Sequence, residues 1–316
     1  MTIIDDLHRY FTIDLFIYNK EILNYTSINA FNLTERHLND ENNKIRECIV
    51  GAIINNKVPE NYYIIKKWCD FKKNIFNFLE KLNSKAYVKV ECIHKAGRKN
   101  NYDFLIRIHE HHDIIQEYHL ELKFNASSID DAPQFVSPMR PSQYMSASYE
   151  KFYYKNFLQQ LATFYELAMP KQDEYMTQIH NDKPKCMKLF QDLYYRGCKK
   201  SSKFTNNSKD IECYEYAKNV SHNSISSFIN YADLNIEMLS NYLYNTQKDK
   251  IYMLYSCTTK RFILQKIDIN DYNIVSVIKN PQKSRYECIT KTGKKINILL
   301  RWKNGNGIAF PAFQIS

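Results

Sequence analysis

The hydrophobic period of this chain changes near residue 86, and this change restricts the fold more than any other feature. Through most of residues 1–80, apolar residues recur at helical spacing. Beyond that point apolar and polar residues alternate, which is typical of strands. The alternation predicts three consecutive strands, and helical spacing then returns: the strands are expected at 86–93, 103–108 and 114–124, and the helix at 146–168. We therefore expect an α/β (α+β) fold with a central mixed sheet flanked by helices.

The remainder of the chain contains a polar stretch and a strand-rich end. Residues at about 170–245 are polar and predict a helical insertion, whereas Ile251–Ser256 is typical of a buried strand. Short strands are predicted over 257–316. We expect a core at 1–256, with N-terminal helices and this insertion, followed by a basic, β-rich subdomain at 257–316.

The net charge favours a polyanionic partner. The formal charge is +10 at pH 7, and Lys and Arg side chains that displace counterions from phosphates give affinity for nucleic acid. A solvated surface charge is the plainer alternative, since an A/T-rich coding sequence enriches Lys in any protein.

The cysteines and the N-terminus both bear on the cellular compartment. The eight cysteines include no Cys-x-x-Cys pair, which argues against a zinc ribbon or a thioredoxin-type site and fits free thiols in a reducing compartment. Residues 1–8 carry acids where a signal peptide carries basic residues, and no run of about eighteen apolar residues follows. We expect a soluble, intracellular protein with no membrane partner, cytoplasmic or, in a eukaryotic or viral setting, nuclear.

The third predicted strand carries an acid and a lysine two residues apart. Side chains two apart on a strand point to the same face, so Glu121 and Lys123 deliver a carboxylate and an ammonium to one place, eighteen residues after Asp103. The other acid-x-Lys triplet, at 70–72, lies in a helix-like run, where residues two apart do not face each other. The alternative for Glu121 and Lys123 is an ion pair on a solvated sheet face.

The order of elements around these residues resembles the PD-(D/E)XK nuclease superfamily, which includes many type II restriction endonucleases. The resemblance covers roughly residues 40–260: a helix, a strand, a strand that begins at Asp103, a strand with Glu121 and Lys123, a helix and a strand. One departure is Tyr102, which stands where the motif name has Pro.

The resemblance implies a Mg²⁺-dependent endonuclease, with Mn²⁺ as a substitute, that cuts double-stranded DNA and leaves 5′-phosphate and 3′-hydroxyl ends. Asp103, Glu121 and the main-chain carbonyl of Leu122 would hold the metal, because Mg²⁺ prefers oxygen ligands. Lys123 would orient or deprotonate the attacking water and neutralise charge in the transition state. A homodimer is the usual route to cutting both strands.

Two further residues are candidates for the same site. Gln160 lies on the predicted helix at 146–168, although the segment Gln160-Leu-Ala-Thr-Phe164-Tyr165 is one residue away from the Gln-x-x-x-Tyr of exonuclease-like relatives. Glu47, on the preceding helix, would supply a further carboxylate, as in some restriction enzymes. The plainer interpretation of Glu47 is a surface helix residue.

Basic residues in four regions are the candidate contacts to DNA phosphates. The segment from Lys279 to Lys303 holds eight Lys or Arg and one acid, Glu287, although a solvated hairpin would have the same composition. The candidates are Lys95, Arg98, Lys99, Arg140, Lys199, Lys200, Lys203, Lys294, Lys295, Arg301 and Lys303.

Other functions stay open at this point. An exonuclease or DNA-repair nuclease of the same superfamily and a non-catalytic nucleic-acid-binding protein are the main alternatives. A zinc protease is not expected, because the His-rich segment 109–113 has Asp113 where the second zinc ligand is needed.

Overall fold

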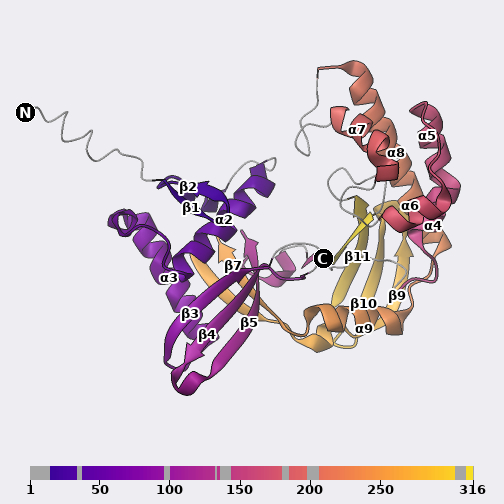
Figure 1. Ribbon diagram of the computed structural model, residues 1–316. Coiled ribbons are helices and arrows are strands. Elements are labelled where there is room, and N and C mark those ends of the chain that lie inside the picture. Colours follow the sequence, from indigo (N-terminus) through magenta and orange to yellow (C-terminus); the bar gives the residue numbers. More distant parts are fainter. Residues whose placement is uncertain are drawn as a thin grey trace, which may run out of the picture. The chain divides into compact units, whose positions relative to one another are not determined.

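A five-stranded mixed sheet organises the first part of the chain. In the computed structural model its strand order is β3-β4-β5-β7-β8, and the structure describes residues 15–33, 38–95, 100–131, 134–135, 144–179, 185–197, 206–302 and 311–315. The strands are β3 (Tyr87–His94), β4 (Phe104–Glu110), β5 (Ile115–Phe124), β7 (Lys250–Ser256) and β8 (Arg261–Lys266). β3, β4 and β5 form an antiparallel meander, and β7 pairs with β5 in parallel and with β8 antiparallel. In Figure 1 the orange β7 accordingly lies beside the magenta β5, although more than a hundred residues separate them in the chain.

Two helices cover the apolar face of this sheet. α2 (Asn39–Ile54) packs on β3, and α3 (Lys66–Leu82) packs on β8. α3 buries Trp68, Phe71, Ile75 and Phe78, spaced three or four residues apart, which places them on one helical face. Burial of each such side chain contributes roughly 1.5–3 kcal/mol to stability. A short hairpin, β1 (Phe16–Tyr18) and β2 (Glu21–Leu23), completes this unit.

A second sheet, with the order β6-β12-β11-β10-β9, belongs to another unit of the chain. Every pair of neighbouring strands in it is antiparallel. Its strands are β6 (Gln134–Phe135), β9 (Ile274–Asn280), β10 (Arg285–Thr290), β11 (Lys295–Trp302) and β12 (Pro311–Ile315). The helices of this unit are α4 (Tyr149–Tyr153), α5 (Gln159–Phe164), α6 (Gln172–Gln178), α7 (Lys188–Gly197), α8 (Ser208–Tyr231) and α9 (Ile236–Gln247).

The core of the second unit is rich in tyrosine. Tyr149 and Tyr286 are fully buried, and each hydroxyl has a partner: Tyr149 Oη lies 2.6 Å from Ser224 Oγ, and Tyr286 donates to Ala232 O at 3.1 Å. A buried hydroxyl without such a partner would be costly. The rings of Tyr149 and Phe152 both lie against Phe228 of α8, with centroids 5.1 and 5.2 Å apart.

The expected fold class is confirmed, and the three consecutive strands begin and end within two residues of the predicted positions. The division of the chain differs from the expected one. One unit comprises Met1–Ala132 and Asp249–Lys266, and the other comprises Pro133–Lys248 and Ile267–Ser316. The predicted insertion and the C-terminal strands therefore belong together, because both contribute to one apolar core.

The helix predicted at 146–168 also belongs to the second unit, where its aromatic side chains pack against α8. A π-helical turn, Tyr154–Leu158, interrupts it between α4 and α5. The hairpin at Phe16–Leu23 was not expected in a region predicted to be mainly helical.

Two observations bear on the environment of the protein. Among the described residues, no helix combines the length and the apolar content that a membrane crossing requires. The seven cysteines in the described ranges are free thiols.

We expect Phe228→Ala to lower the free energy of unfolding by about 3–5 kcal/mol, because it leaves a cavity where α8 meets Tyr149 and Phe152. Urea denaturation followed by circular dichroism measures this loss. The matched control is Ile278→Ala in the same unit, where the side chain is 63% exposed and the expected change is within about 0.5 kcal/mol. Equal effects of the two substitutions would contradict the packing of α8 described here.

Candidate functional site

Asp103 lies directly before β4 and beside the Glu-x-Lys strand. Phe104 pairs with Leu120, and continuing this antiparallel register by one residue places Asp103 across from Glu121. Residues opposite each other in this way point to the same face of a sheet. The N–H of Leu122 donates to Asp103 Oδ2 at 2.8 Å, and the N–H of Asp103 donates to Leu120 O at 2.9 Å. The backbone of β5 thus holds the carboxylate of Asp103 next to Glu121.

Glu121 is a buried carboxylate between two lysines. Its Oε1 lies 2.5 Å from Lys123 Nζ, and its Oε2 lies 2.5 Å from Lys250 Nζ. The side chains of Glu121 and Lys123 are only 10% and 15% exposed, so they do not form an ion pair on a solvated face. Lys250 opens β7, where it pairs in parallel with His119, two residues before Glu121.

Lys250 was not among the residues expected from the sequence. The segment 251–256 was identified as a buried strand, and a lysine at the start of such a strand is the signal that could have drawn attention to it. Its closeness to Glu121 depends on the parallel pairing of β5 with β7, which spacing along the chain does not reveal.

Glu47 joins the two other carboxylates from α2. Burial, and then the charges of Asp103 and Glu121, raise the pKa of Glu47 to about 8. The side chain is half-buried and lies within the field of Lys123 as well. Glu47 is therefore only partly exposed to solvent and lies within electrostatic range of Asp103 and Glu121.

The carboxylates of the cluster differ in their affinity for protons. Burial, and then the charge of Glu121, raise the pKa of Asp103 to about 6. For Glu121 burial acts in the same direction, yet the ammonium groups of Lys123 and Lys250 outweigh it and hold its pKa below the usual range. Near neutral pH and without a cation, Glu121 is ionised while Glu47 is mostly protonated. An added positive charge would favour the ionised forms of Asp103 and Glu47.

The donor atoms of this cluster suit a hard divalent cation. Carboxylate and carbonyl oxygens are the ligands that Mg²⁺ and Mn²⁺ prefer. The N–H of Leu122 binds Asp103, and the ligand set of Asp103, Glu121 and the Leu122 carbonyl stays a prediction. In the described part of the chain, no three His, Cys, Asp or Glu side chains stand in a metal-binding arrangement. Both oxygens of Glu121 face ammonium groups instead.

An aromatic pair borders the cluster. The rings of Tyr102 and His119 stack with centroids 4.2 Å apart and planes inclined by 6°. Tyr102 precedes Asp103, and His119 lies on the same face of β5 as Glu121. Tyr102 therefore has a packing partner on β5, the strand that carries Glu121 and Lys123.

Gln160 belongs to a different unit of the chain from Glu121. It lies on α5 in the second unit, exposed, where its Nε2 donates to Asn156 O at 3.2 Å. Gln160 follows the buried Tyr153 by seven residues, a spacing that would place both on one face of a regular α-helix. The π-helical turn at Tyr154–Leu158 adds a residue to one turn and rotates the rest of the helix, so Gln160 is exposed. The expected role of Gln160 in supporting the site of Asp103 and Glu121 stays a prediction.

Of the candidate DNA contacts, Lys95 lies next to Asp103, because its backbone N–H donates to Asp103 O at 2.8 Å. Lys294 lies in the second unit, 3.4 Å from Asp271, and Lys295 and Arg301 are the first and a late residue of β11. The remaining candidates lie outside the described residues: Arg98, Lys99, Arg140, Lys199, Lys200, Lys203 and Lys303. The His-rich segment forms the end of β4 and a short turn at His111–Asp113, which does not provide the helical face of a zinc protease.

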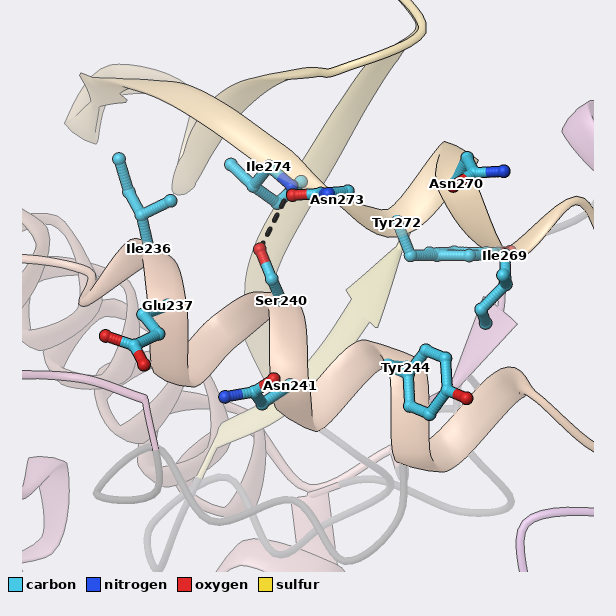
Figure 2. Close-up of a pocket in the computed structure, with 10 residues that line it drawn as sticks. All are labelled: Ile236, Glu237, Ser240, Asn241, Tyr244, Ile269, Asn270, Tyr272, Asn273 and Ile274. Atoms are coloured by element: carbon cyan, nitrogen blue, oxygen red, sulfur yellow. Dashed lines mark hydrogen bonds between the residues drawn. The ribbon is translucent and has the colours of Figure 1, made fainter.

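A hollow of about 610 Å³ lies elsewhere, on the second unit. Figure 2 shows residues of α9, including Ser240 and Tyr244, facing the segment Ile269–Ile274. Ser240 Oγ accepts the N–H of Ile274 at 3.0 Å. Among the described residues that line the hollow, Glu237 is the one charged residue. These residues therefore include neither paired carboxylates nor basic groups like those around Glu121. The candidate site is therefore the carboxylate cluster.

We expect the stability of the protein in EDTA to fall as the pH rises from about 5 to 8, because folded Glu47 binds its proton more tightly than the unfolded chain does. Glu47→Gln should remove this part of the pH dependence. Between pH 5 and 8 the free energy of unfolding of the variant should therefore rise by about 1–2 kcal/mol relative to that of the unsubstituted protein. Urea denaturation at stepped pH measures it, with the exposed Glu60→Gln as the control. Parallel pH profiles of the Glu47→Gln variant and the unsubstituted protein would show that Glu47 is not protonated by its surroundings.

Comparisons with known proteins add no further assignment. No family model matches the chain, and no curated protein or solved structure matches it either. The function must therefore be argued from the cluster of Glu47, Asp103, Glu121, Lys123 and Lys250.

Proposed function

We propose that this protein is a Mg²⁺-dependent endonuclease that hydrolyses phosphodiester bonds of double-stranded DNA, with Mn²⁺ as a substitute metal. The observation that carries the proposal is the placement of Asp103 and Glu121 across two neighbouring strands, with Lys123 beside Glu121 on the same face. The same three residues carry the resemblance to the PD-(D/E)XK superfamily. By that resemblance the products have 5′-phosphate and 3′-hydroxyl ends.

The proposed chemistry assigns a separate task to each residue. Asp103, Glu121 and the Leu122 carbonyl would hold the metal, whose charge, when it is bound, polarises a phosphoryl oxygen and favours ionisation of water. Asp103 is held in place by the N–H of Leu122. Glu47 is a further carboxylate close enough to act on the same charges.

Lys123 is assigned the electrostatic role. Burial acts to lower the pKa of Lys123, but the Glu121 carboxylate outweighs it and holds the pKa above the ordinary lysine value. An ammonium in this state donates hydrogen bonds and does not accept a proton. We propose that Lys123 orients the attacking water and stabilises the negative charge of the transition state.

The partner and the setting follow from less specific observations. The net charge of +10 supports a nucleic acid as substrate. We propose a homodimer with paired sites as well, because the cutting of both strands of a duplex would need two sites. The free thiols support action in a reducing compartment inside the cell.

Digestion of a covalently closed circular plasmid tests the proposal. With Mg²⁺ or Mn²⁺ we expect the circle to be cut, and with EDTA to stay intact. Cutting only after linearisation would favour an exonuclease or repair nuclease of the same superfamily. Binding without cleavage in both metals would favour a non-catalytic nucleic-acid-binding protein.

Glu121→Gln should lower the cleavage rate by about 100-fold or more, because the amide neither ligates the metal well nor keeps the negative charge. The control is Glu117→Gln on the same strand, where the side chain is 48% exposed and pairs with Arg107. Affinity for DNA in Ca²⁺ should change little in either variant. Undiminished cleavage by Glu121→Gln would contradict the assignment of the site.

A further inference from the structure

Lys250 is a second buried lysine on the carboxylate that the proposed function assigns to the metal. Its side chain is 2% exposed, and its Nζ lies 2.5 Å from Glu121 Oε2. This contact is ionic, because Lys250 Nζ makes no hydrogen bond of acceptable geometry with any described residue. Of the three N–H groups of this ammonium, one is directed at Glu121, and the other two are available as donors to another acceptor.

The charge of Glu121 alone does not account for Lys250. Lys123 already lies 2.5 Å from the other oxygen of the same carboxylate. Burying an ammonium costs several kcal/mol, and one carboxylate does not balance two of them. Around Glu121 the two buried lysines thus provide one positive charge beyond the one that this carboxylate neutralises, and in the absence of a cation that charge acts on the neighbouring Asp103.

The strand pairing shows on which face of the sheet the Lys250 ammonium lies. In the parallel pairing of β5 with β7, Lys250 lies opposite His119, and Tyr252 lies opposite Glu121. Lys250 Nζ is 5.7 Å from the centre of the Tyr252 ring, so the side chain lies along β7 on the face that carries Glu121. Lys123 and Lys250 approach Glu121 from its two oxygens, one from β5 and one from β7.

We infer that Lys250 is a second phosphate-binding lysine, whose ammonium binds a non-bridging oxygen of the phosphodiester while Lys123 acts on the attacking water. The inference rests on the proposed function of the site. A carboxylate engaged with a divalent cation needs no ammonium partner, whereas a phosphate oxygen beside it accepts charge-assisted hydrogen bonds from lysine. Lys250 is then a catalytic residue of the site and not a structural one.

Three variants test this inference. Lys250→Met keeps an unbranched side chain of similar length and removes the charge, and Lys250→Arg keeps the charge. Lys266→Met is the matched control, because Lys266 is exposed on β8 of the same sheet, opposite Ile251. Three quantities are measured for each variant: its affinity for Mn²⁺ by calorimetry, its affinity for a short DNA duplex in Ca²⁺, and its rate of plasmid cleavage in Mg²⁺.

Lys250→Met should bind the duplex about 10-fold more weakly in Ca²⁺, because one charge-assisted contact to phosphate is lost. Its affinity for Mn²⁺ should be unchanged or higher, since a positive charge beside Glu121 has been removed. Cleavage should fall by about 100-fold and recover in part in Lys250→Arg. Lys266→Met should behave like the unsubstituted protein in all three measurements.

Two results would overturn the inference. Tighter binding of Mn²⁺ with unchanged duplex affinity and cleavage would show that Lys250 is only a counter-charge for Glu121. If Lys250→Met instead lost both its affinity for Mn²⁺ and its thermal stability, Lys250 would be a structural residue. If the unsubstituted protein cleaves no DNA but Lys250→Met still weakens duplex binding in Ca²⁺, the proposed function fails and the phosphate contact of Lys250 stands.

Discussion

The site depends on one interaction, the burial of the Glu121 carboxylate between the ammonium groups of Lys123 and Lys250. A lone carboxylate in this position would be costly, because burial disfavours its charged form. The two lysines offset that cost and keep Glu121 ionised. The contacts also connect strands, since Lys123 shares β5 with Glu121 and Lys250 comes from β7. Asp103, before β4, is tied to the same place by the Leu122 N–H.

The cluster around Glu121 contains charges of both signs, which suits the proposed catalysis on a phosphodiester. Three carboxylates, two of them with pKa values raised by burial and by their neighbours, are gathered with two buried ammonium groups. A divalent cation would relieve the repulsion among the carboxylates, and a phosphate would satisfy the ammonium groups. The two ligand types that a metal-dependent nuclease brings together are thus complementary to the two kinds of charge in the cluster.

Local sequence patterns were sufficient to predict the parts of the site that lie on consecutive strands. Alternation predicted β3, β4 and β5, and the period of two placed Glu121 and Lys123 on one face. Asp103 could be paired with them because a meander brings neighbouring strands together. Glu47 was a weaker prediction, since helical spacing alone does not show how deeply a helix residue is buried.

The parts that could not be predicted depend on contacts between distant segments. Lys250 lies near Glu121 because β7 pairs in parallel with β5, and the residues between these two strands form most of the helices of the second unit. The exposure of Gln160 could not be predicted either, because a π-helical turn changes the phase of its helix. Residues 257–316 were expected to form one subdomain, but β8 belongs to the first sheet and β9 to β12 belong to the second.

The central claim is that Asp103 and Glu121 together form a site for a divalent cation, and calorimetric titration with Mn²⁺ tests it most directly. The unsubstituted protein should bind Mn²⁺ at one site, and Asp103→Asn should bind it at least about 10-fold more weakly, because a carboxylate ligand has become a neutral amide. Equal affinity in the two proteins, or no binding of Mn²⁺ by the unsubstituted protein, would contradict the account.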